Sequence, residues 1–227
     1  MNFIEYVKKW GYGHSPSALS QIYYLNYLFT NKLVVPYENN IVIGKPFGSS
    51  AYYYVWEKLG YIPPAKYHPG VKASEIPFVD YGEETLGNAL GFASGMELGN
   101  KKLTWVNLSD GQMQMGPTLE AIQFIGRNKQ NIKVTIDSNG KRLTSSLLTT
   151  LDADIAMFKY NGWTVMGVGE DFSAFDIGFD IPGPVVFFVL TKKGDGVKEM
   201  EADTQYWHYR EIQDEEFTLS DKLKAIA

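Results

Sequence analysis

The chain has 227 residues, a formal net charge of −5 and no cysteine. Disulfides, thiolate catalysis and cysteine-ligated metal centres are therefore excluded, and an acidic balance without a basic stripe disfavours nucleic-acid binding. No stretch reaches the roughly 20 apolar residues of a membrane span, and no basic or apolar leader follows Met1, so we expect a cytoplasmic protein that acts on a small molecule or another protein.

The first predicted helix covers residues 17–29 and follows His14 in a Gly-His-Ser-Pro turn. The first amides of a helix lack intrahelical partners, so these amides and the imidazole can meet an anion. A loop histidine satisfied by its surroundings is the structural alternative. Tyrosines gather in this helix and again at residues 52–54, and a Pro-rich loop covers residues 61–77. Burial within helices explains some of these tyrosines, and the surplus predicts a large subunit interface, where tyrosine combines apolar area with a polar tip. The loop is long enough to belong to an active site or an interface.

Residues 103–108 and 132–136 are predicted as buried strands, with a helix over residues 116–129 between them. In a parallel sheet the loops after both strands reach the same edge, where α/β proteins bind ligands. Asp110 and Asn139 would then converge, and with a backbone carbonyl of Lys141 they suit Mg²⁺, which takes its remaining ligands from water and phosphates. We therefore predict one α/β domain with a parallel sheet flanked by helices. Asp-Gly and Asn-Gly are also common turn dipeptides, so ordinary turns are the alternative to a metal site at these two loops.

Residues 109–116, Ser-Asp-Gly-Gln-Met-Gln-Met-Gly, are followed by Glu120, ten positions after Asp110, and by Asn139 beyond the next strand. This pattern resembles the thiamine-diphosphate motif of the transketolase family. Five further segments stand in the family's order: residues 13–20, 86–95, 158–163, 184–194 and the pair Trp207-His208. The resemblance implies the diphosphate-binding fold of that family over residues 1–227.

The resemblance also implies roles for the matched residues. Those implied to bind thiamine diphosphate are His14, Leu86, Gly87, Asp110, Gly111, Asn139 and His208. Those implied to hold Mg²⁺ are Asp110, Asn139 and Lys141. Catalytic roles fall to His14 and His208 in proton transfer and to Glu120 as a carboxylate at the subunit interface. From the residues alone, His208 could equally belong to an ordinary aromatic cluster.

A complete transketolase has three domains, and this sequence resembles only the first. The resemblance therefore implies a split enzyme, paired in a heterotetramer with a separately encoded subunit that carries the pyrimidine-binding domain. It would transfer a two-carbon ketol unit from a ketose donor to an aldehyde acceptor. Two alternatives are the α-type subunit of a thiamine-diphosphate 2-oxo acid dehydrogenase or decarboxylase, and a non-catalytic scaffold. Phe47 and Met115 stand where the family has a His and a Glu, which predicts an unusual donor.

Overall fold

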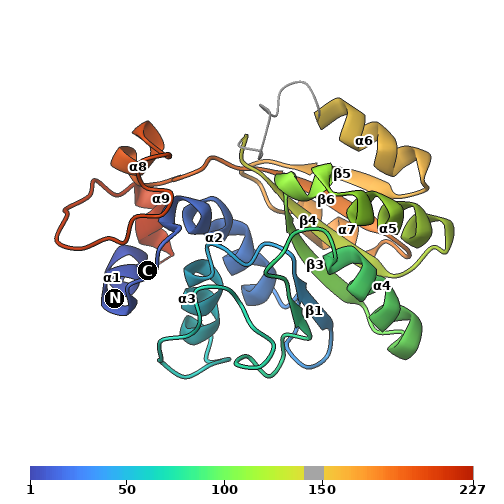
Figure 1. The fold of residues 1–227 in the computed structure, drawn as a ribbon, viewed down its shortest axis with the longest axis horizontal. Helices are drawn as coiled ribbons and strands as arrows, with labels where there is room; N and C mark the ends of the chain where they lie inside the picture. Colours follow the sequence, from blue (N-terminus) through green and yellow to red (C-terminus); the bar gives the residue numbers. More distant parts are fainter. Residues whose placement is uncertain (141–150, 227) are drawn as a thin grey trace.

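A six-stranded sheet forms the centre of the computed structural model, which describes residues 1–140 and 151–226 (Figure 1). All neighbouring strands run parallel. Across the sheet the order is β2 (Tyr81–Gly82), β1 (Asn40–Ile43), β3 (Thr104–Ser109), β4 (Ile132–Ser138), β6 (Val185–Leu190) and β5 (Thr164–Val168). The parallel α/β fold predicted from the sequence is confirmed.

Helices cover both faces of the sheet. One face carries α4 (Ala89–Asn100), α5 (Gly116–Arg127) and α6 (Leu151–Tyr160). The other carries α2 (Ser15–Thr30), α3 (Ser50–Lys58) and α7 (Ala174–Asp180), and the same apolar core includes residues of α1 (Phe3–Trp10), α8 (Lys198–Ala202) and α9 (Asp221–Ala225). Because successive strand residues point to opposite faces, Trp105 joins one core and Val106 the other.

The register of the two central strands positions the site. Thr104 pairs with Ile132 and Ser109 with Asp137, so β3 and β4 end at the same level. After β3 the chain turns through the short 3-10 helix η1 (Asp110–Gln114) into α5. The loops after these strands therefore lie side by side at the carboxyl edge of the sheet, as the sequence predicted.

Helix α2 is buried on nearly all sides between the sheet and the helices outside it. Its Tyr24 is fully buried and donates to the Asn107 Oδ1 atom at 3.0 Å, while Tyr53 of α3 donates to the His68 carbonyl at 2.9 Å. The prediction that these tyrosines form a subunit interface is therefore wrong. Their polar tips find partners inside the chain, which lets the rings fill its core.

A short helix, α7, forms in the segment between β5 and β6 and has seven residues. Phe175 and Phe179 anchor it by packing their rings on Phe187 of β6, at centroid distances of 4.9 and 5.7 Å.

Among the residues that the structure describes, none of the helices has the length and apolar character needed to cross a membrane.

Candidate active site

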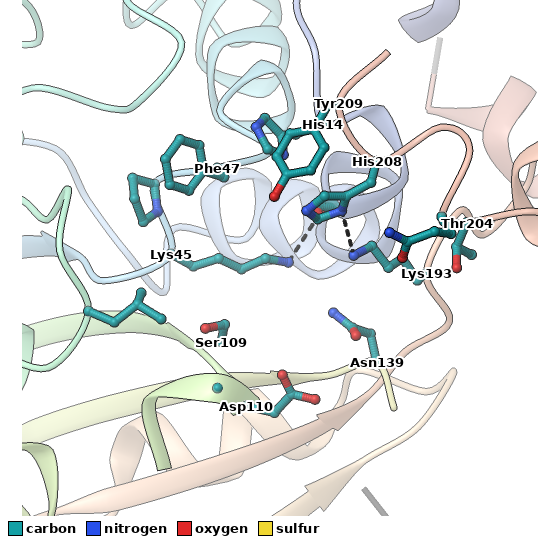
Figure 2. A pocket seen from close by; sticks show the side chains of 15 residues that line it. His14, Lys45, Phe47, Ser109, Asp110, Asn139, Lys193, Thr204, His208 and Tyr209 are labelled. Carbon is teal, nitrogen blue, oxygen red and sulfur yellow. Dashed lines mark hydrogen bonds between the residues drawn. The ribbon is translucent and has the colours of Figure 1, made fainter. Parts of the chain in front are cut away.

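A pocket of about 630 Å³ opens at the carboxyl edge of the sheet, within the size range of small-molecule sites. Its walls come from the loops after β1, β3 and β4, the start of α2, and the segments around Lys193 and His208 (Figure 2). The predicted site residues that line it are His14, Leu86, Asp110, Gly111, Asn139 and His208. Residues spread over most of the chain thus meet in one cavity.

Asp110 and Asn139 lie near one another at the sheet edge (Figure 2). Asp110 is only 1% exposed because the 3-10 turn after β3 folds it inward. Lys141, the third predicted metal ligand, lies outside the described residues. Within the described part of the chain, no three His, Asp or Glu side chains are grouped closely enough to hold a metal ion. A cation at this edge would therefore need oxygen ligands from a bound molecule as well as from the protein.

His14 has an uncommon backbone conformation. Its φ of 58° and ψ of 28° are left-handed, and its side chain does not cap α2 although it precedes the helix. Few residues other than glycine adopt this region, though histidine does so more often than most. The turn directs the imidazole into the pocket instead of onto the helix amides. Gly13 fits there because a Cβ atom would come within 3.3 Å of the Tyr209 carbonyl oxygen.

The two predicted histidines meet edge to face, with ring centroids 5.1 Å apart. Burial lowers the pKa of His14 to about 4, with further lowering from His208 and Lys193. Burial, then Lys193, also lowers the pKa of His208. Both rings are therefore neutral at pH 7. The Lys193 Nζ atom is 3.0 Å from His208 Nδ1, and because an ammonium group only donates, Nδ1 accepts and Nε2 carries the proton.

An ion pair that the sequence analysis missed lies beneath the pocket. Asp137, the last residue but one of β4, is fully buried and pairs with Lys45, which follows β1 and is itself buried. Burial alone would raise the pKa of Asp137, but Lys45 and hydrogen bonds from Thr191 and Ser20 bring it below its usual value. The carboxylate is therefore ionised. No local sequence pattern predicts this ion pair, because Lys45 follows one strand and Asp137 lies near the end of another.

A second buried carboxylate, also missed, joins the loops on the other side of the pocket. Glu83 is 1% exposed and accepts from the backbone amides of Asn88 and Ala89 at the start of α4. Its other oxygen accepts a hydrogen bond from Gln112 Nε2 at 2.6 Å. The same Nε2 group also donates to the Gly44 carbonyl at 2.7 Å. Burial raises the pKa of Glu83, and these hydrogen bonds oppose that shift. The loop before α4 is thereby tied to the loop that carries Asp110.

Leu86 lines the pocket from that loop, and Gly87 follows it with a φ of 125°. A side chain at Gly87 would be strained by this φ and would place its Cβ atom 3.3 Å from that of Met115. Phe47, predicted at the donor site, does line the pocket, and its ring centroid lies 4.8 Å from that of His14. Glu120 is exposed on α5 and is not among the lining residues, so its interface role stays a prediction.

Solved structures with a similar arrangement of elements include transketolases. The transketolase of Campylobacter jejuni superposes with a TM-score of 0.70 at 18% identity, over 91% of this chain and 38% of that one. That of Leishmania mexicana gives 0.70 at 16%, over 99% and 42%. A transketolase mutant of Pichia stipitis, in complex with fructose-6-phosphate, gives 0.71 at 15%, over 98% and 41%. The chain has a transketolase-like fold.

Sequence comparison points in the same direction. The 1-deoxy-D-xylulose-5-phosphate synthase of Aquifex aeolicus is 30% identical over a 125-residue alignment that covers 45% of this chain and 20% of the synthase. No protein-family model matches the chain. The chain thus spans about two fifths of the length of the solved transketolases, and its alignment with the synthase covers a fifth of that protein.

Proposed function

We propose that this chain is the diphosphate-binding part of a transketolase-like enzyme. With thiamine diphosphate and Mg²⁺, it would transfer a two-carbon ketol unit from a ketose-type donor to an aldehyde acceptor. The observation that carries the proposal is the meeting of Asp110, Asn139, His14 and His208 in one pocket of a transketolase-like fold. A scaffold subunit has no need for this set, which disfavours the non-catalytic alternative. The likeness to transketolases favours ketol transfer over 2-oxo acid oxidation.

The donor set of the pocket fits the cofactor and its metal. The Asp110 carboxylate and the Asn139 amide offer the hard oxygen ligands that Mg²⁺ prefers, and bound phosphates and water would supply the remaining ligands. The amide groups of the first turn of α2 and the Lys193 ammonium group supply positive potential for a diphosphate. Thiamine diphosphate, when bound, supplies the carbon nucleophile and the electron sink for breaking a carbon–carbon bond.

The histidines supply proton transfer and orientation. Because His14 is neutral at pH 7, it can accept a proton from a hydroxyl group near the reacting carbon. The Nε2–H group of His208 is a donor whose tautomer is set by Lys193 on the opposite nitrogen. The two rings thus provide one acceptor and one donor in the same cavity, as addition to and release from a carbonyl group require.

Activity would further require a domain outside these 227 residues, which we place on a partner subunit carrying the pyrimidine-binding domain, in a heterotetramer. The outer surfaces of α4 and α5 support a subunit contact. Phe92 and Leu98 of α4 and Phe124 of α5 are each about half exposed, at 51, 45 and 50%. Large apolar side chains that stay exposed on neighbouring helices are a feature of interaction surfaces.

The test is Mg²⁺-dependent binding of thiamine diphosphate, measured by calorimetry with wild type and Asp110→Ala. We expect the variant to lose about ten-fold or more in affinity and to lose its dependence on Mg²⁺, because the diphosphate charge loses its bridge. Asp180→Ala removes an exposed aspartate at the end of α7 and is the matched control. Metal-independent binding of undiminished affinity by Asp110→Ala would refute the assignment.

A further inference from the structure

Four segments of the pocket converge on the carboxylate of Asp137. Its Oδ2 atom accepts from Ser20 of α2 at 2.7 Å, from Asn139 Nδ2 at 2.9 Å and from the Lys45 ammonium group. Its Oδ1 atom accepts from the Thr191 hydroxyl group after β6. Asp137 touches no solvent and does not line the pocket itself. It therefore acts on the site through the residues it holds.

The most consequential of these contacts is the one to Asn139. An ionised carboxylate only accepts hydrogen bonds, so it can face the amide nitrogen of Asn139 but not the amide oxygen. Lys45 keeps the carboxylate ionised by pairing with it in a buried setting. The Asn139 amide is thereby held in one of its two flip states, with Nδ2 toward Asp137 and Oδ1 turned away from this carboxylate.

We propose that Asp137, paired with Lys45, is a positioning residue that presents the Asn139 Oδ1 atom to a metal ion at the sheet edge. The proposal rests on the proposed function, since it assumes that Asn139 is a metal ligand. Groups that orient a metal ligand in this way commonly change metal affinity by 10- to 100-fold, although they do not touch the metal.

Lys45 extends the effect to the opposite wall of the pocket. Its Nζ atom also donates to the Ser17 carbonyl group at 3.1 Å and to the Ser20 hydroxyl group at 3.1 Å. Ser17 and Ser20 belong to the first two turns of α2, the helix that follows His14. The same buried pair therefore sets the spacing between the start of this helix and the Asn139 loop.

The experiment titrates MgCl₂ into the purified chain with thiamine diphosphate and measures cofactor binding by calorimetry. For Asp137→Asn we expect the Mg²⁺ concentration at half-saturation to rise about ten-fold or more, because the amide at position 137 no longer selects one flip state of Asn139. Ser20→Ala is the control, since it removes a hydrogen bond from the same carboxylate oxygen but leaves the Asn139 contact. It should stay within about three-fold of wild type.

A charge swap separates positioning from a general structural role. In Asp137→Asn/Asn139→Asp the donor is at position 137 and the acceptor at 139, so an oxygen of residue 139 again faces the metal. We expect this swap to recover most of the Mg²⁺ affinity lost by Asp137→Asn. If Asp137→Asn does not fold, Lys45→Met/Asp137→Asn removes both charges and carries the same expectation of weakened Mg²⁺ binding.

Two results would overturn the proposal. Folded Asp137→Asn, or the neutral double variant, with unchanged Mg²⁺ half-saturation would show that Asp137 does not position the ligand. A swap no better than Asp137→Asn alone would show that the loss was structural. A wild-type chain that binds thiamine diphosphate without any Mg²⁺ dependence would instead refute the proposed function, which distinguishes the two failures.

Discussion

The buried imidazole of His14 should make the folded chain less stable in mild acid. Its pKa is lowered from 6.5 to about 4 in the folded chain, by burial first and then by His208 and Lys193. Between these two values the unfolded chain binds more protons than the folded chain, so the free energy of unfolding falls as the pH drops through this window. Above pH 6.5 both states are neutral at this position and the full contribution is present.

The size of the effect follows from the two pKa values. For one group shifted from 6.5 to about 4, linkage gives about 2 kcal/mol between pH 8 and pH 5. Because the imidazole borders an open pocket, solvent screening reduces this, and we expect about 1 kcal/mol. His14→Asn removes the titration and suits the left-handed backbone, which Asn tolerates better than most residues.

Urea unfolding of wild type and His14→Asn at pH 5 and pH 8 measures this directly. Wild type should lose about 1 kcal/mol more than the variant on going from pH 8 to pH 5. His208 remains in both proteins, so its own titration largely cancels in the comparison. An equal pH dependence in the two proteins would refute the assignment of a buried, neutral imidazole at position 14.

Three further expectations concern a buried lysine, the donor and the assembly. Burial lowers the pKa of Lys133 to about 8, so between pH 8 and 9.5 the unfolded chain holds more of this proton than the folded chain. Over this window the free energy of unfolding of wild type should rise by about 1.5 kcal/mol relative to that of Lys133→Met. Equal changes with pH in the two proteins, measured by urea unfolding, would contradict this. Phe47 cannot hydrogen-bond to a hydroxyl group of the donor substrate, so wild type with its partner should prefer deoxy-ketoses or 2-oxo acids as donors. In assays with a panel of donors, Phe47→His should shift this preference toward sugar phosphates. Efficient use of xylulose phosphate by wild type would place Phe47 outside the donor site. Phe124→Asp should weaken self-association or partner binding in sedimentation velocity without lowering Tm, and an unchanged sedimentation profile would exclude this helix face.

Much of the fold and part of the site could be predicted from the sequence because the rules involved are local. The apolar runs at residues 103–108 and 132–136 and the helical period between them define a strand–helix–strand unit. Parallel topology then sends both following loops to one edge of the sheet, and this is enough to predict that Asp110 and Asn139 lie together, as they do in the pocket. His14 and His208 were found through their resemblance to a family, since nothing in their local patterns brings residues so far apart together.

Tertiary structure alone decided the buried polar connections. Lys45 and Asp137 are 92 positions apart, and Glu83 and Gln112 are 29 apart, and neither pair has a periodic signal. The location of the tyrosines also could not be predicted from the sequence. A subunit interface and a core both favour an apolar ring with a polar tip, so sequence could not tell them apart. The internal partners of Tyr24 and Tyr53 settle the choice, because a buried hydroxyl group needs an acceptor that only the folded chain supplies.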